Sequence, residues 1–118
     1  MKLIVAILRP ELLPCVEAAL KRFEIHSLAF TETHSYGQGE GHNLIYRSSE
    51  IRVRTSPRLR LEIIVDSFDG EEVADAIADS CVLPRSRFTS ECKVFVMPLD
   101  HYVDVSDREH EALPARSR

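Results

Sequence analysis

Two neighbouring stretches of the chain hold residue types that recognise anions. Gly37, Gly39 and Gly41 follow a strand-like segment, and glycines there allow backbone N–H groups to point at an anion. A flexible hinge explains the same glycines equally well. Residues 46–60 contain five arginines and one glutamate, a local charge of +4 in a protein of net charge −4. This charge fits either a solvated loop or a contact with an anion or partner protein.

Catalytic and metal-binding patterns are weak. The sequence has no nucleophile elbow, P-loop or paired-cysteine metal motif, and its five histidines are scattered. His34 and His42 flank the glycines, and we interpret them as surface residues, with a metal site as the alternative. Cys92 lies beside Lys93, which could favour its thiolate, but no base partner is evident and a structural cysteine is the simpler interpretation. We therefore expect no catalytic residues, no bound metal and no enzyme activity.

Length and composition exclude several other classes. A chain of 118 residues is the size of one domain. A pI of about 5.7 argues against a nucleic-acid partner. No apolar run approaches the ~18 residues of a membrane span, and the N-terminus does not resemble a signal peptide. Cys15, Cys81 and Cys92 are odd in number and unpatterned, which indicates reduced thiols and predicts a cytoplasmic protein.

Hydrophobic periodicity predicts the elements that position these residues. Strands are expected at 2–8, 27–35, 58–65 and 93–97, and helices at about 12–23 and 71–81, the second with Asp69 as N-cap. Residues 36–57 are interpreted as one long irregular connection. This order predicts an α+β, ferredoxin-like βαββαβ sandwich over residues 1–105. Residues 106–118 are expected to form a flexible tail.

Two helices can cover only one face of such a sheet. The other face would be lined by Arg60 and Glu62, by Ile4 or Val5, and by Phe95 or Val94. This face is too apolar to be left in water, so the sequence predicts a homo-oligomer.

The sequence also resembles the PII-like signalling proteins, which are small homotrimers of ferredoxin-like fold that bind adenine nucleotides. Residues 1–20 are similar to the first strand and helix of that family, and residues 57–65 and 93–96 to its third and fourth strands. Residues 37–50 resemble its loop signature, through Gly37, Gly41, His42, Tyr46, Arg47, Ser49 and Glu50. The resemblance covers about residues 1–100 and implies the same fold and a homotrimer.

The resemblance also implies a site and a partner. Nucleotides would bind in clefts between subunits, and a protruding T-loop, about residues 36–57, would contact a membrane transporter or a metabolic enzyme. The implied nucleotide-binding residues are Ile7, Ser35, Tyr36, Gly37, Gln38, Glu62, Ile64, Arg87, Thr89, Ser90 and Lys93, with Lys93 reaching a phosphate. The residues expected to contact a partner or an anion are Gly41, His42, Tyr46, Arg47, Ser49, Glu50, Arg52, Arg54 and Arg58.

Several positions depart from the family pattern. Ile51 stands where many members carry a modifiable tyrosine, which excludes uridylylation there. Gly39 replaces the glutamine that members use for magnesium and 2-oxoglutarate, so magnesium is not expected to be held in the usual manner. Residues 90–92 replace a glycine-rich phosphate loop, and Asp104 and Ser106 take the place of two phosphate-binding arginines. We therefore expect ADP or AMP to be favoured, with ATP binding more weakly.

These departures point toward PII-like proteins linked to inorganic carbon uptake and carboxysomes. The leading hypothesis is a non-enzymatic regulator that responds to ADP or AMP, with bicarbonate as a candidate ligand. One alternative is standard nitrogen regulation of an ammonium transporter with ATP and ADP. An alternative of another class is a metal-binding trimer of the CutA type, with His34, His42 or Cys92 as ligands.

Overall fold

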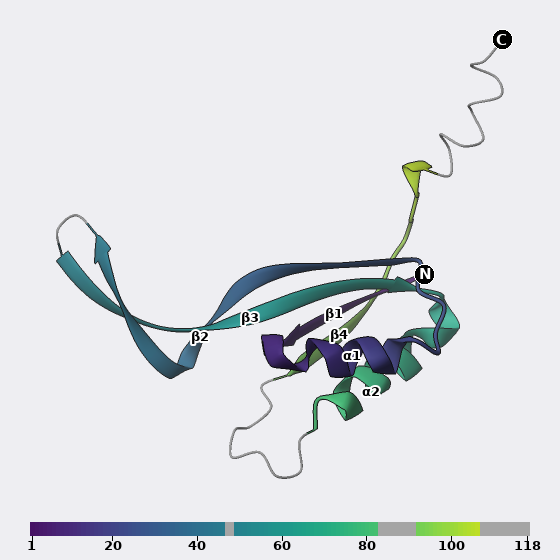
Figure 1. Cartoon of the computed structure of the whole chain (residues 1–118). Coiled ribbons are helices and arrows are strands. Elements are labelled where there is room, and N and C mark those ends of the chain that lie inside the picture. The colour runs from purple at the N-terminus through teal and green to yellow at the C-terminus, as the bar shows by residue number, and fades with distance from the viewer. Residues whose placement is uncertain (47–48, 83–91, 107–118) are drawn as a thin grey trace.

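The chain forms a single antiparallel sheet with two helices on one side (Figure 1). The computed structural model describes the backbone of residues 1–46, 49–82 and 92–106, and the side chains of residues 1–36, 55–82 and 92–106. Its elements are β1 (Lys2–Leu8), η1 (Pro10–Leu12), α1 (Leu13–Leu20), β2 (Ser27–Tyr46), β3 (Ser49–Val65), η2 (Ser67–Asp69), α2 (Gly70–Ser80) and β4 (Lys93–Pro98). None of the described helices is long and apolar enough to cross a membrane.

The strand order is β2-β3-β1-β4, and every neighbouring pair is antiparallel. Because β3 lies between β1 and β2, and β1 lies between β3 and β4, each half of the chain is a split βαβ unit. This is the ferredoxin-like α+β architecture that the sequence predicted. The strand predicted at 2–8 has the observed bounds, whereas the predicted tail lies outside the described residues from 107 onward.

The hydrophobic core fills the space between the sheet and the two helices. Every residue of this core is at most 5% exposed, and the set comprises Ile4, Ala6, Leu8, Leu12, Val16, Leu20, Leu59, Leu61, Ile63, Val65, Val73, Ile77 and Cys81. In β3 the buried apolar residues occupy alternate positions, and Val73, Ala76 and Ile77 of α2 are buried as well. Large apolar area is therefore removed from water on one face of the sheet.

Two details of the helices differ from the sequence predictions. Helix α1 ends at Leu20, three residues before the predicted end, although Phe23 still packs against the core. Asp69 occupies the N-cap position of α2 but makes no capping hydrogen bond through its side chain, so the predicted cap is wrong. The reason is its backbone, which is helical at φ −91° and ψ −12° because Asp69 also ends η2. A capping side chain usually requires extended dihedrals.

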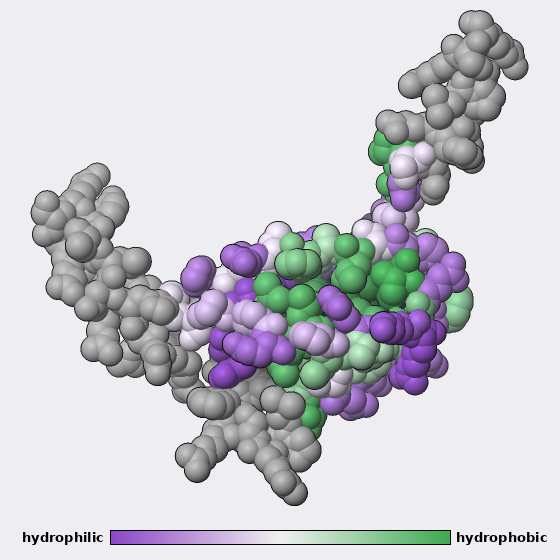
Figure 2. Space-filling view, viewed as in Figure 1, coloured by the Kyte–Doolittle hydropathy of each residue, from purple (hydrophilic) through white to green (hydrophobic). Residues whose placement is uncertain are grey.

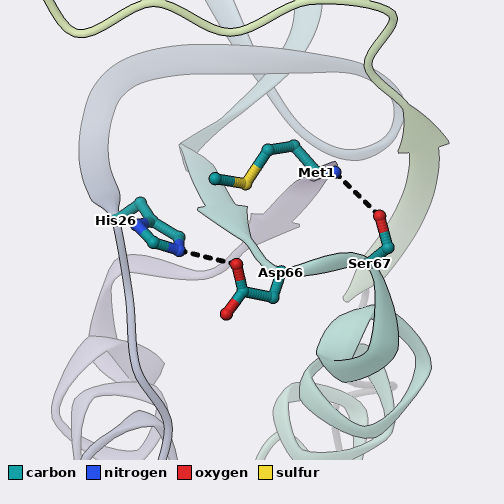
Figure 3. A network of polar contacts seen from close by, with 4 residues as sticks. All are labelled: Met1, His26, Asp66 and Ser67. Atoms are coloured by element: carbon teal, nitrogen blue, oxygen red, sulfur yellow. Dashed lines mark hydrogen bonds and ion pairs between the residues drawn. The ribbon is translucent and has the colours of Figure 1, made fainter.

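Two polar contacts stabilise the end of the sheet where β1 begins and β3 ends (Figure 3). The Met1 amino group donates a hydrogen bond to Ser67 Oγ at 2.7 Å, and His26 Nε2 lies 2.9 Å from Asp66 Oδ1. The backbone N–H of His26 also donates to the carbonyl of Ile64 at 2.9 Å. These contacts hold the entry to β2 and the N-terminus against the end of β3.

Strands β2 and β3 continue beyond the body of the protein as a two-stranded ribbon (Figure 1). Pairing resumes at Gly41↔Arg54 and runs to Tyr46↔Ser49. The prediction of an irregular connection over 36–57 is therefore wrong for most of this segment. The segment shows no hydrophobic alternation in the sequence, and antiparallel backbone pairing does not require such a pattern.

The face of the sheet opposite the helices carries apolar side chains. Val5 pairs with Glu62 on one side and with Phe95 on the other, which settles the two alternatives left open by the sequence. Phe95 is 46% exposed and Met97 39%. Arg60 Nε lies 3.3 Å from Glu62 Oε1 on the same face. We call this surface the open face.

The edge strand β2 adds further exposed apolar residues. Leu28 and Phe30 pair with Ile63 and Leu61 and so share the side that faces the helices. Because β2 is at the edge, Leu28 stays 47% exposed and Phe30 56%. Figure 2 shows hydrophobic residues gathered across the middle of the body, with hydrophilic residues around them. A single subunit thus leaves a sizeable apolar surface in contact with water.

Candidate functional site

A cleft of about 330 Å³ lies where the ribbon leaves the sheet. All four strands contribute to it, and its lining residues are Ile7, Thr33, His34, Ser35, Tyr36, Arg58 and Lys93. Its volume is at the lower end of the range for small-molecule sites.

The strand register explains why these residues meet. Ile7 is the last residue but one of β1, and it pairs directly with Lys93 at the start of β4. On the other side of the sheet Thr33 of β2 pairs with Arg58 of β3. Side chains of one strand alternate between the two faces, so Ser35 shares the face of Thr33. The register therefore brings one lysine and one arginine to the same end of the sheet.

The cleft has a positive electrostatic character. Arg58 is only 5% exposed, and its Nη1 donates a hydrogen bond to the Pro57 carbonyl at 2.8 Å. Lys93 and His34 are exposed, and none of the described residues that line the cleft is acidic. A charge near a low-dielectric interior acts on an anion more strongly than the same charge in bulk water. The arrangement is therefore suited to binding an anion.

An irregularity in β2 begins at the wall of the cleft. Tyr36 pairs with Thr55 and Gly41 with Arg54, so residues 37–40 have no Cα partner in the register of β3. These four residues include Gly37 and Gly39, the glycines in which the sequence indicated a hinge or an anion-binding turn. Since glycine adopts backbone conformations closed to other residues, it suits a break in the ladder.

The structure brings together part of the predicted nucleotide site. Of the eleven residues predicted for it, the cleft is lined by Ile7, Ser35, Tyr36 and Lys93. Glu62 and Ile64 lie farther along the open face, opposite Val5 and Leu3, and do not line the cleft. The backbone of Gly37 and Gln38 follows Tyr36 directly, but their side chains lie outside the described ones. Arg87, Thr89 and Ser90 fall outside the described residues.

The described residues among those predicted for the T-loop separate into two groups. The backbone of Gly41, His42, Tyr46, Ser49, Glu50, Arg52 and Arg54 belongs to the paired ribbon. Arg47 lies outside the described residues. The side chain of Arg58 is described, and it is buried in the cleft beside Thr33.

Three lining residues, Thr33, His34 and Arg58, were absent from the predicted nucleotide set. The alternation of polar residues in 27–35 could have placed Thr33 with Ser35. The pairing of Thr33 with Arg58 depends on the register between β2 and β3, and a shift of one residue would have moved Arg58 to the other face. The sequence carried no signal for that register beyond the buried alternation of β3.

The residues considered for a metal or a nucleophile do not gather into one site. Within the described part of the chain no group of three or more His, Cys, Asp and Glu could hold a metal ion. His34 lines the cleft, Cys92 packs against the core, and the side chain of His42 is outside the described ones. The pKa of the Cys92 thiol is raised, first by its hydrogen bond to Cys81 and then by burial. The interpretation of Cys92 as a structural cysteine therefore agrees with its packing against the core, and the alternative of a thiolate favoured by Lys93 is not supported.

Comparisons with known proteins agree with this architecture. The family model described as nitrogen regulatory protein P-II matches residues 1–109. The chain is 35% identical over 112 residues to nitrogen regulatory protein P-II of Rhizobium etli, covering 95% of this chain and 97% of that protein. It is 33% identical to nitrogen regulatory protein P-II 1 of Methanothermobacter thermautotrophicus, covering 93% of each. The fold, the ribbon and these matches together show that the chain belongs to the P-II family of signalling proteins.

Proposed function

We propose that this chain is a non-enzymatic regulator whose cleft binds an adenine nucleotide, with ADP or AMP favoured over ATP. The observation that carries the proposal is that two cationic side chains lie in one cleft together with an apolar and an aromatic side chain. Arg58 and Lys93 would hold phosphate oxygens through charge-assisted hydrogen bonds. Ile7 and the 82% exposed Tyr36 offer surface for a nucleoside.

The preference for fewer phosphates follows from the number of cations. Family members carry two further phosphate-binding arginines after the fourth strand, and this chain has Asp104 and Ser106 at those positions. The carboxylate of Asp104 accepts hydrogen bonds from the backbone N–H of Ser106, at 2.9 Å, and from its hydroxyl group. A triphosphate would therefore bring more negative charge without finding more positive charge in this segment.

A homotrimer would complete the site. Proteins of the P-II family are trimeric and interact with transporters and enzymes. In a trimer, neighbouring subunits would cover the open face around Val5 and Phe95, which is too apolar to remain in water. They would also enclose a nucleotide that a cleft of about 330 Å³ in one subunit holds only in part.

The ribbon would transmit the bound state to a partner. Tyr36 lines the cleft and also ends the regular pairing that precedes the irregular residues 37–40. A nucleotide that contacts Tyr36 would change the population of ribbon conformations and so the affinity for a membrane transporter or a metabolic enzyme. Bicarbonate is a second candidate ligand, because the arginine-rich ribbon would suit a small anion.

The names of the relatives favour a second candidate. The two relatives described above are named nitrogen regulatory proteins, which would suit regulation of an ammonium transporter with ATP and ADP. Calorimetric titration of AMP, ADP and ATP, each with and without bicarbonate or 2-oxoglutarate, distinguishes the two candidate functions. Tighter binding of ADP or AMP supports the first candidate, and tighter binding of ATP supports the second. Absence of heat with all three nucleotides at millimolar concentration would refute nucleotide binding itself.

A further inference from the structure

A row of side chains crosses the open face at the edge of the cleft. Arg60 of β3 pairs with Ile7 of β1, and Ile7 in turn pairs with Lys93 of β4. Directly paired residues of antiparallel strands project from the same face of a sheet. Ile7 and Lys93 line the cleft, whereas Arg60, on the other side of Ile7, is not among the lining residues.

Arg60 is also a neighbour of the second cation of the cleft. Arg58 precedes it by two residues in β3, so the two arginines share a face and their Cα atoms are roughly 7 Å apart. The strands β3 and β1 are neighbours, which places Ile7 about 5 Å from Arg60. Long side chains reach one another over such spacings. The register therefore groups Arg58, Arg60 and Lys93 around Ile7.

A carboxylate holds the Arg60 side chain on the side away from the cleft. Arg60 Nε donates a hydrogen bond to Glu62 Oε1 at 3.3 Å, and Glu62 pairs with Val5, which lies farther from the cleft than Ile7. The two side chains are 43% and 53% exposed, and exposed ion pairs contribute little to stability. An arginine has five N–H donors, of which this hydrogen bond uses one. A stronger anion can therefore replace Glu62 at small cost.

We propose that Arg60 is a third anion-binding residue of the cleft, which Glu62 restrains until a diphosphate group displaces its carboxylate. A diphosphate carries more negative charge than one carboxylate, and the guanidinium fork matches the geometry of phosphate oxygens. Arg58 and Lys93 would hold the anion at the cleft, and Arg60 would turn toward it. This assignment deepens the proposed function and rests on it, because it adds a residue that would bind the diphosphate of a nucleotide.

Calorimetric titration of inorganic pyrophosphate and of ADP, in buffer without divalent cations, tests the assignment. Arg60→Gln should weaken the binding of both ligands about fivefold, the effect of losing one solvent-exposed charged contact. Arg22→Gln is the matched control, because Arg22 is exposed after α1, outside the cleft, and the change in net charge is the same. It should leave both affinities unchanged. Circular dichroism and light scattering compare the fold and the mass of the variants with those of the wild type.

A double-mutant cycle tests the restraint by Glu62. Glu62→Gln should strengthen pyrophosphate binding about threefold, because the ligand no longer competes with an exposed ion pair for Arg60. In the Arg60→Gln background the same substitution should gain much less, since no arginine remains to be released. Glu32→Gln is the matched control: Glu32 is exposed and pairs with the buried Leu59, on the face of the sheet that the helices cover.

Several results would overturn the inference. Pyrophosphate that binds equally well to the wild type and to Arg60→Gln, or that does not bind the wild type at millimolar concentration, would show that Arg60 holds no anion. Weaker binding by Glu62→Gln would show that Glu62 contacts the ligand itself, and an equal gain with and without Arg60 would exclude the restraint. A lower mass of Arg60→Gln in light scattering would assign Arg60 to an interface between subunits.

Failure of the proposed function has a different signature. If pyrophosphate binding depends on Arg60 and no adenine nucleotide binds, nucleotide recognition is refuted and the anion site stands. If ADP binds the wild type and Arg60→Gln with the same affinity, the assignment of Arg60 is refuted and the proposed function stands.

Discussion

Lys93 is the cation of the cleft that can be removed with the least effect on the fold. Its side chain is exposed at the start of β4, whereas the other cation, Arg58, is buried. Lys93→Gln keeps a polar side chain of similar length and removes the charge that would contact a phosphate. Lys21→Gln is the matched control, because Lys21 is exposed at the end of α1, outside the cleft, and the change in net charge is the same.

The expected loss of ADP affinity follows from the setting of Lys93. A hydrogen bond to a charged group contributes about 1.5–3 kcal/mol, and the exposed position favours the lower figure. A loss of about 1.5 kcal/mol corresponds to a roughly tenfold higher Kd. The salt dependence of ADP binding should also weaken, since one screened attraction is gone. Calorimetric titration at two salt concentrations measures both effects.

The outcome of this comparison can refute the reasoning. If Lys93→Gln and Lys21→Gln have the same Kd for ADP and the same salt dependence as the wild type, Lys93 does not contact the nucleotide. If both variants lose affinity equally, the protein's overall charge attracts the ligand and the cleft is not the site. Circular dichroism of the two variants shows whether a loss of affinity reflects a change in fold.

Three further predictions concern the core, the assembly and the pKa of Cys81. Ile63→Ala removes a fully buried side chain and should lower the free energy of unfolding, measured by urea titration, by about 2–5 kcal/mol. Leu28→Ala, at an edge-strand residue that is 47% exposed, should lower the free energy of unfolding much less. Equal losses in the two variants would contradict the placement of the core. Phe95→Glu should reduce the mass found by light scattering from that of the proposed trimer to that of a monomer, whereas Phe68→Glu, at an exposed residue of η2, should leave the mass of the assembly unchanged. A Phe95→Glu protein that keeps the mass of a trimer would show that the open face is not the interface. The ultraviolet absorbance of the thiolate should titrate at about pH 7 for Cys81, since its pKa is lowered from 9.0, and a titration only near pH 9 would contradict the hydrogen bond between the thiols.

The sequence predicted the parts of the fold that depend on burial. Lys2–Leu8 reads as a strand apolar on both faces, and the alternation of Leu59, Leu61 and Ile63 marks the buried side of β3. The alternation in β3 arises because a core on one side of a sheet selects apolar residues at every second position. The continuous apolar run of β1 is typical of a strand in the middle of a sheet, where both faces are covered. They remain visible without any knowledge of the partner strands.

The ribbon and half of the cleft could not be predicted in the same way. Backbone pairing from Gly41↔Arg54 to Tyr46↔Ser49 needs no pattern of side chains, so the segment resembled a loop. Arg58 resembled an exposed member of an arginine-rich stretch, and only the register of β2 against β3 places it beside Thr33 in the cleft.

The central claim is that the cations of this cleft hold the phosphates of an adenine nucleotide. A crystal structure of the protein with ADP tests it most directly. The account predicts diphosphate oxygens within about 3 Å of Lys93 Nζ or the Arg58 guanidinium group, in the cleft beside Ile7 and Tyr36. Ordered ADP at another surface, with this cleft empty, would contradict it.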